Sequence, residues 1–284
     1  MRNPMLKRTG KIERMTALWL IGTLMLLSPI AASADNLRAD TLQRWDEYVK
    51  EVEARNQRRV TLEQSFLWTD EVQGQAQKLR GGDIVVIPAA PHIPLSVPSG
   101  LIHDWIAAAF IPRVTLPDIL SVVRDYGRYK EFYSPNVANS VPLTTSEWED
   151  RFSLMLVNRS VIAQTALDGD YRSSYRHIDD LRWYSVTAST RMQEVADYGT
   201  SSQHMLPENQ GTGYMWREFS ITRFEERDGG VYVELEAVVL SRDVPLLLRW
   251  LVDPIVRRMS QSSLETSLTK TRNAVRSTAD KSRG

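Results

Sequence analysis

Residues 231–240 (VYVELEAVVL), residues 241–245 (SRDVP) and the long segment 246–275, which begins LLLRW, decide the fold of this chain. In the first segment side chains alternate between the two faces of a strand, with Val231, Val233, Leu235, Ala237 and Val239 on one face and Tyr232, Glu234, Glu236, Val238 and Leu240 on the other. The last segment has apolar residues at helical spacing and follows a proline, which suits the first turn of a helix. Pro254 is expected to kink or split that helix. The stretch therefore predicts a strand, a tight connection and the longest helix of the chain.

The segments before this stretch predict an antiparallel sheet. Apolar and polar residues alternate within them, and turn residues separate them. Asp228-Gly229-Gly230 predicts the hairpin that joins the last two strands, because glycine accepts positive φ at no steric cost. The expected strands are residues 101–111, 137–143, 148–157, 161–173, 181–189, 214–226 and 231–240.

Two short helices are expected between the first and second of these strands. Thr115 and Asp118 have the spacing of a helix cap, which predicts a helix over residues 115–125. A second short helix carries Tyr126, Tyr129, Phe132 and Tyr133, and ends before Pro135.

The first 34 residues predict a secretory signal peptide. Residues 2–14 are basic, residues 17–27 form an apolar run of 11 residues, and Ala32-Ser33-Ala34 is a typical cleavage site. The run is short for a membrane-spanning helix, which needs about 20 apolar residues. We expect cleavage after Ala34 and a periplasmic or secreted protein, with an uncleaved anchor as the alternative.

Residues 35–99 predict an N-terminal helical extension with a proline-rich connector. An apolar stripe through Trp45 and Val49 predicts a helix over residues 37–59. Four prolines between residues 88 and 98 predict an extended connection, because proline fixes φ and lacks a backbone donor. Residues 100–278 then form the main domain, and residues 279–284 a polar tail.

Composition excludes several functions. The sequence has no cysteine, so it offers neither disulfides nor thiol chemistry. Its four histidines show no metal-binding spacing, so no metal site and no other cofactor is expected. The formal net charge is zero and the exported part is mildly acidic, which gives no electrostatic case for nucleic acid.

The order of one strand, two short helices, about six antiparallel strands and a long helix resembles the START-like superfamily, also called the polyketide cyclase/dehydrase-type or helix-grip group. The likeness is carried by residues 110–137, with FIP, LPDIL, DYGRY and FYSPNV, and by YVELEAVVLSRDVP (residues 232–245) with the helix after it. It covers about residues 100–278. It implies an α+β fold in which a curved antiparallel sheet wraps around a long C-terminal helix. It also implies a hydrophobic cavity for a lipid, sterol, quinone or polyketide, and no single catalytic motif.

A binding site is expected between the sheet and the C-terminal helix. Aromatic residues with a polar group suit a mainly apolar cavity, and apolar helix residues would face them. The candidate ligand-binding residues are Tyr126, Tyr129, Tyr133, Trp183, Trp216, Leu247, Trp250 and Leu251. For each of them, packing in the core is the simpler alternative.

Charged residues within apolar strands predict a structural ion pair, because a buried charge needs a partner. We expect Arg217 or Arg242 to pair with Glu234 or Glu236, unless these side chains lie on a solvated face.

The favoured function is an exported protein that binds an apolar small molecule or lipid, with no catalytic residues. The first alternative is a cyclase- or aromatase-like enzyme, which would bring together titratable groups such as His103, His177, Glu218 or a tyrosine in the cavity. The second is an interaction module whose cavity is filled by its own side chains. The sequence leaves the ligand, transient membrane contact and the oligomeric state open.

Overall fold

The structure is a computed structural model that describes residues 35–159, 164–244 and 246–283. The predicted signal peptide, residues 1–34, lies outside the described residues.

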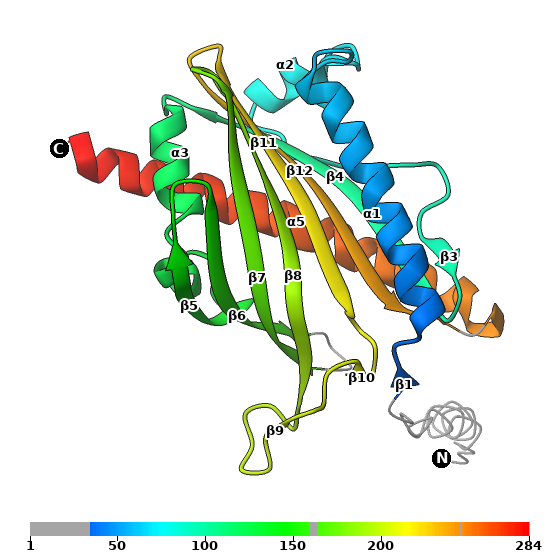
Figure 1. Ribbon diagram of the computed structural model, residues 1–284. Helices are drawn as coiled ribbons and strands as arrows, with labels where there is room; N and C mark the ends of the chain where they lie inside the picture. The colour runs from blue at the N-terminus through cyan, green and yellow to red at the C-terminus, as the bar shows by residue number, and fades with distance from the viewer. Residues whose placement is uncertain (1–34, 160–163, 245, 284) are drawn as a thin grey trace, which may run out of the picture. The chain divides into compact units, whose positions relative to one another are not determined.

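One large sheet and one long helix dominate the described residues (Figure 1). The strands of the sheet are β2 (Val85–Pro88), β3 (Leu95–Val97), β4 (Gly100–Pro112), β5 (Val137–Thr145), β6 (Glu149–Arg159), β7 (Gln164–Asp179), β8 (Arg182–Ala196), β9 (His204–Met205), β11 (Arg217–Arg227) and β12 (Gly230–Arg242). The helices are α1 (Ala39–Val60), α2 (Gln75–Arg80), α3 (Leu116–Val123), α4 (Tyr129–Phe132) and α5 (Leu246–Arg283), with short 3₁₀ turns η2 (Trp68–Asp70) and η3 (Tyr126–Arg128).

All pairings in this 10-stranded sheet are antiparallel, in the order β2-β4-β12-β11-β8-β7-β6-β5, with β3 beside β4 and β9 beside β8. Two short strands, β1 (Asp35–Asn36) and β10 (Gln210–Gly211), form a separate pair. The predicted α+β class, with a curved antiparallel sheet and a long C-terminal helix, is confirmed.

Helices cover both faces of the sheet: α1 lies on one face and α5 on the other (Figure 1). Side chains of β12 therefore pack alternately against the α5 side and the α1 side of the sheet. Val231 and Val233 pack with the core beside α5, whereas Val238 and Leu240 pack with the core beside α1. The predicted alternation of the two faces of this strand is therefore correct.

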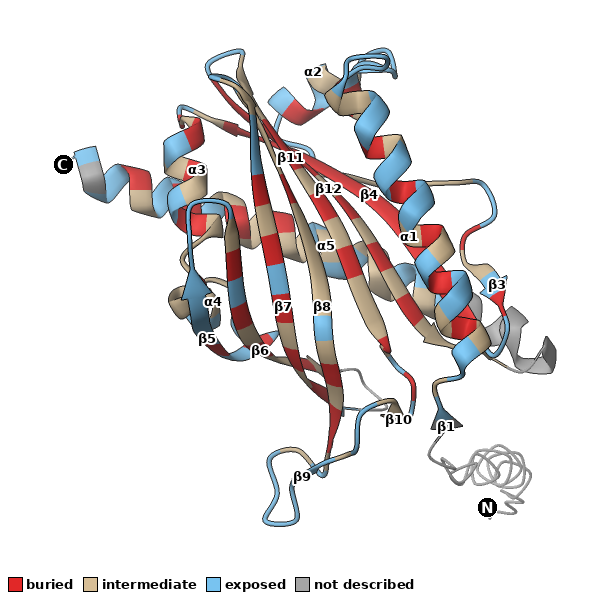
Figure 2. Ribbon diagram, in the orientation of Figure 1, coloured by how far each residue is buried: buried red, intermediate tan, exposed pale blue. Residues whose placement is uncertain are grey.

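β4 is buried along almost its whole length, residues 100–111 (Figure 2). Its neighbours β2, β3 and β12 pair with it, α5 packs on one of its faces, and α1 and α2 pack on the other. A strand covered on both sides has no solvent face, so its sequence reads as a continuous apolar run instead of an alternating one.

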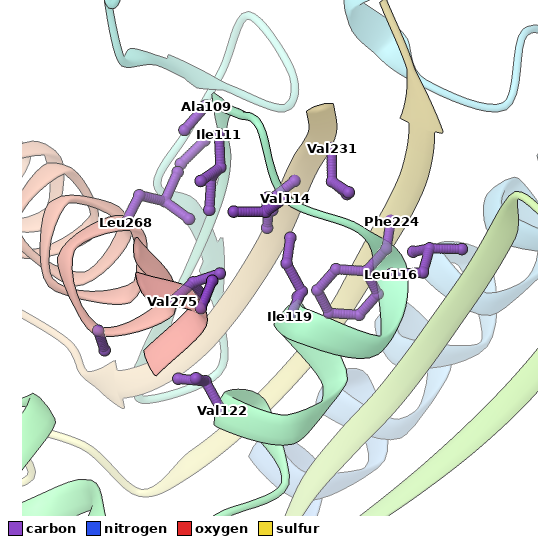
Figure 3. Packing of buried hydrophobic residues seen from close by; sticks show 14 residues of the cluster. Ala109, Ile111, Val114, Leu116, Ile119, Val122, Phe224, Val231, Leu268 and Val275 are labelled. Atoms are coloured by element: carbon purple, nitrogen blue, oxygen red, sulfur yellow. The ribbon is translucent and has the colours of Figure 1, made fainter. Parts of the chain in front are cut away.

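A compact apolar core joins α3, α5 and the adjacent part of the sheet. Figure 3 shows side chains from these elements converging, among them Ile119 and Val122 of α3 and Leu268 and Val275 of α5. The predicted cap starts α3, since the Asp118 carboxylate accepts hydrogen bonds from the Thr115 backbone N–H (2.9 Å) and hydroxyl (3.0 Å). This core fills one end of the space between the sheet and α5.

Several element boundaries differ from the prediction, most of all at β8, at β7 and at the C-terminus. β8 runs to Ala196, whereas the prediction ended this strand at residue 189. β7 continues to Asp179, whereas the prediction ended this strand at residue 173. Ser173 to His177 stay paired with β8 although few of them are apolar, so the sequence pattern did not indicate a strand there. The predicted polar tail, residues 279–284, is helical to Arg283, whose guanidinium donates to Asp118 (2.9 Å) and to the Arg113 carbonyl (2.9 Å).

Candidate ligand-binding cavity

A cavity of about 350 Å³ lies between the sheet and α5. Its walls come from the segment between α3 and β5, from strands β6, β7, β8, β11 and β12, and from residues 263–271 of α5. This is the location that the sequence predicted for a ligand site.

Side-chain size explains why the space is open here and filled beside α3. Phe224 and Val233 face α5 at the filled end of the sheet. Farther along the same face, Ser185, Ser220 and Ala237 are small, and they leave room that the helix does not occupy. A void persists where facing side chains are too short to meet.

Aromatic rings form one wall of the cavity. Tyr126 stacks on Phe152 with ring centroids 3.9 Å apart, and Phe152 stacks on Tyr171 at 5.3 Å. The Tyr129 hydroxyl donates to the Val123 carbonyl (2.6 Å). Burial raises the pKa of Tyr126, Tyr129 and Tyr171, so these phenols stay neutral near pH 7.

Glu218 is the acidic residue in the cavity wall. Its Oε2 accepts a hydrogen bond from the Tyr171 hydroxyl (3.1 Å). Burial raises the pKa of Glu218, and the Tyr171 hydrogen bond opposes that shift only in part. In the part of the chain that the structure describes, no cationic side chain forms an ion pair with Glu218. A neutral carboxylic acid is therefore favoured here more than at an exposed glutamate.

The cavity reaches the surface between α5 and the segment before β5, where the lining residues Asn136 and Ser263 are exposed. Lys270 bridges the two sides at this point. Its Nζ donates to the carbonyls of Tyr133 (3.2 Å) and Ser134 (2.6 Å) and to Asn136 Oδ1 (3.0 Å). The Tyr133 hydroxyl adds a hydrogen bond with Thr271 (3.0 Å).

The structure brings three of the predicted ligand-binding residues to the cavity. Tyr126, Tyr129 and Tyr133 line it, as expected. Trp183 packs instead beside the core of Figure 3, with its ring 5.1 Å from that of His177. Trp216 is buried in the core beside α1, so it faces the other side of the sheet.

The predicted helix residues Leu247, Trp250 and Leu251 stay a prediction. Their side chains lie outside the described part of the structure. Among the described residues of α5, those that line the cavity lie between Ser263 and Thr271.

The predicted carboxylates Glu234 and Glu236 do form buried ion pairs, on the α1-facing side of the sheet. Arg223 binds both, at 3.2 Å to Glu234 and 3.1 Å to Glu236, and all three side chains are at most 4% exposed. Arg55 of α1 adds a bond to Glu236 (3.0 Å).

The basic partner therefore differs from the predicted one. Arg217 lies opposite Leu240 and donates to Asn209 Oδ1 (2.8 Å), while Arg242 lies opposite Gly100. Arg223 lies directly opposite Glu234 in the register. Cross-strand position, which the sequence does not reveal without the register, decides the pairing.

The two histidines considered for catalysis do not line the cavity. His103 is buried near the start of α5, where its Nε2 lies 3.0 Å from the Ser241 hydroxyl, and burial lowers its pKa to about 4. His177 is near the end of β7, within 4.0 Å of Asp180.

Sequence reasoning missed the hydroxyl residues of the cavity floor: Ser173, Ser185, Thr187, Ser220 and Thr222. On β11 the polar residues alternate with the buried Phe219 and Ile221, and a strand with one solvated face has the same pattern. Only the position of α5 shows that this polar face is enclosed.

Two features are absent from the described residues, 35–159, 164–244 and 246–283. No helix among them is both long and apolar enough to cross a membrane. No group of three or more ligating side chains in residues 35–159, 164–244 and 246–283 has the arrangement of a metal site.

Comparisons with known proteins identify structures but no sequence relatives. No protein-family model matches the chain, and no curated protein matches it. A STAR-related lipid transfer protein from Xanthomonas axonopodis is 17% identical, with a TM-score of 0.44 over 68% of this chain and 98% of that one. The Zhui aromatase/cyclase from Streptomyces is 11% identical (TM-score 0.38; 61% and 96% covered), and a START superfamily protein from Mycobacterium smegmatis is 10% identical (0.37; 62% and 97%).

The element order, the curved antiparallel sheet and the long C-terminal helix on one face of that sheet are those of a helix-grip fold, which is the fold of this chain.

Proposed function

We propose that this protein is an exported carrier that binds a small, mainly apolar molecule in the cavity between its sheet and α5, without catalysing a reaction on it. One observation carries the proposal: the cavity of about 350 Å³ has a wall of stacked aromatic rings and aliphatic side chains. Pockets for small ligands begin at roughly 300 Å³. A cavity of this size argues against the alternative in which the protein's own side chains fill the space.

Apolar burial supplies the affinity in this proposal. Each 100 Å² of apolar ligand surface removed from water contributes roughly 2.5 kcal/mol. The polar groups of the wall then set the orientation of the ligand.

Mass spectrometry of the protein purified from its native envelope tests the proposal. The wild type is expected to release one small molecule that a denatured control does not carry. Ala237→Trp places an indole in the cavity floor and should abolish this cargo, whereas Ala54→Trp, at an exposed position of α1, should keep it. Recovery of nothing from the wild type, or equal cargo in both variants, would contradict the proposal.

Export rests on the sequence of residues 1–34, and it has its own test. Protein recovered from the periplasm or medium should begin at Asp35. Recovery in the membrane fraction with residues 1–34 intact would support the uncleaved anchor, and recovery in the cytoplasm would contradict export.

A second candidate function, a cyclase-like enzyme, is favoured by the hydrogen bond between Glu218 and Tyr171 inside the cavity. A carboxyl with a raised pKa can exchange protons with a bound substrate. The Glu218→Gln variant separates the two functions. A carrier should hold the same molecule in the wild type and in Glu218→Gln, whereas an enzyme should accumulate its substrate only in the variant.

A further inference from the structure

A line of polar groups crosses the floor of the cavity along one strand. Glu218, Ser220 and Thr222 of β11 share the cavity face at alternate positions, so the line spans roughly 13 Å. On the adjacent strand β8, Ser185 lies opposite Thr222 and Thr187 opposite Ser220. The cavity therefore has one polar side, facing a wall of rings and aliphatic chains.

Several of these groups are free to bind a ligand. The Thr187 hydroxyl is bonded to that of Ser173 (2.8 Å). In the described part of the chain, the hydroxyls of Ser185, Ser220 and Thr222 have no hydrogen-bond partner. Leaving such groups unsatisfied against an apolar ligand costs free energy, so a ligand with matching oxygen or nitrogen atoms is favoured over a hydrocarbon.

Glu218 extends the line with a stronger group. Tyr171 occupies its Oε2, and within the described residues Oε1 has no hydrogen-bond partner. A protonated carboxyl both donates and accepts, so it suits a carbonyl or hydroxyl. It does not suit an anion. The ionised form of Glu218 would repel the anion, and the anion would lose its own hydration on entering the cavity.

The cationic group at the cavity mouth does not change this preference. Lys270 is the only cationic residue among the described lining residues. An ammonium has three N–H donors, and those of Lys270 have three oxygen acceptors in the protein. An anionic head group would have to replace bonds that hold α5 to the segment before β5.

We propose that the ligand is an uncharged molecule with an apolar body and hydrogen-bonding oxygen atoms along one edge, which bind Glu218, Ser220 and Thr222. The proposal rests on the proposed binding function and narrows its ligand class. It argues against a plain alkyl chain and against a fatty-acid anion.

Four two-ring probes of similar size test this ligand class: naphthalene, 2-naphthol, 1,4-naphthoquinone and 2-naphthoate. Equilibrium dialysis against the wild type at pH 7 measures each dissociation constant. The naphthol and the quinone should bind about tenfold more tightly than naphthalene, as expected for one added hydrogen bond. The carboxylate should bind most weakly.

The double variant Ser220→Ala, Thr222→Val should bring 2-naphthol and the quinone to within about twofold of naphthalene, with naphthalene itself bound as in the wild type. Ser174→Ala, which removes a hydroxyl from the opposite face of β7, should leave all four constants unchanged. Circular dichroism checks that each variant is folded, and the wild-type ranking decides the question if one is not.

Equal binding of all four probes, or tightest binding of naphthalene or 2-naphthoate, would overturn this inference and leave the cavity as a binding site. Binding of none of the four would overturn both the inference and the proposed function.

Discussion

Asp104 lies in the middle of β4 with its side chain fully buried, on the α1-facing side of the sheet. Its Oδ2 accepts hydrogen bonds from the Tyr48 hydroxyl (2.8 Å) and from Arg55 (2.7 Å). With Glu234 and Glu236, it makes three buried carboxylates against the two guanidiniums of Arg55 and Arg223. Burial, and then the charge of Glu236, raise the pKa of Asp104 to about 7.

The Asp104→Asn variant tests this titration through stability. Because the pKa is about 7 in the folded chain and near 3.8 in the unfolded one, the folded protein keeps a proton that the unfolded chain releases in this window. Wild-type stability relative to Asp104→Asn should therefore fall as pH rises from about 4 to about 7, by on the order of 2–4 kcal/mol. Denaturant unfolding of both proteins at several pH values measures it.

Both proteins contain His103, whose lowered pKa changes the stability in the same pH window but in the opposite direction. Its contribution therefore cancels when the two proteins are compared. Glu53→Gln, at an exposed position of α1 outside the cluster, should give a flat difference. A flat difference for Asp104→Asn as well would show that Asp104 keeps an ordinary pKa.

The buried Arg223 gives a second prediction at this scale. Removing one member of a buried ion cluster leaves charges without compensation, so Arg223→Met should lower the free energy of unfolding by about 3–5 kcal/mol. Arg151→Met removes an exposed arginine from the same sheet and should cost less than about 1 kcal/mol. Similar losses in urea unfolding of the two variants would contradict the role given to the cluster.

At the scale of elements, α5 closes the cavity and is attached to its mouth through Lys270 and Thr271. Lys270→Met removes three hydrogen bonds to the segment before β5, so this side of the cavity should open more often. The dissociation rate of bound 1,4-naphthoquinone in stopped-flow displacement should rise about tenfold, with a smaller effect on the association rate.

Arg276→Met serves as the control for Lys270→Met, because Arg276 is an exposed basic residue on the same helix and does not line the cavity. Equal dissociation rates in the two variants would show that ligand exchange does not pass between α5 and Asn136.

The sequence pattern predicted the elements well and the site only in part. Alternation identified β12 and both of its faces, because Glu234 and Glu236 fall on the α1-facing side, where Arg223 pairs with them, while Val231 and Val233 fall on the α5-facing side. The repeat of Leu264, Leu268, Thr271 and Val275 also marked a helix face, and this face lines the cavity and its neighbouring core. The stronger apolar signal after Leu246 led to the prediction of Leu247, Trp250 and Leu251, whose side chains lie outside the described residues. Hydrophobicity alone does not say which residues of a helix face a cavity.

At the scale of the whole described chain, residues 35–99 do more than extend the sheet domain. α1 contributes Trp45 and Val52 to the core beneath it, and Asn56 accepts a hydrogen bond from Arg223 (3.0 Å). Glu234 accepts hydrogen bonds from the backbone N–H groups of Trp68 (3.0 Å) and Thr69 (3.3 Å). The polar groups of one sheet face thus depend on this segment for their partners.

We therefore expect the chain of residues 100–284 to be unable to fold without residues 35–99, although the predicted domain boundary lies between them. Its sheet would expose the apolar residues beneath α1, and Asp104, Arg223, Glu234 and Glu236 would lose the partners that residues 35–99 supply in the described structure. The chain of residues 35–284 should unfold cooperatively in urea, while 100–284 should be insoluble or show no cooperative transition. The Val52→Ala variant of the longer chain tests the same contact in a smaller step. It should lower the free energy of unfolding by about 1–3 kcal/mol, because Val52 is fully buried against the sheet. A soluble 100–284 fragment with a cooperative transition would show that the sheet and α5 suffice for the fold, and that residues 35–99 only cover it.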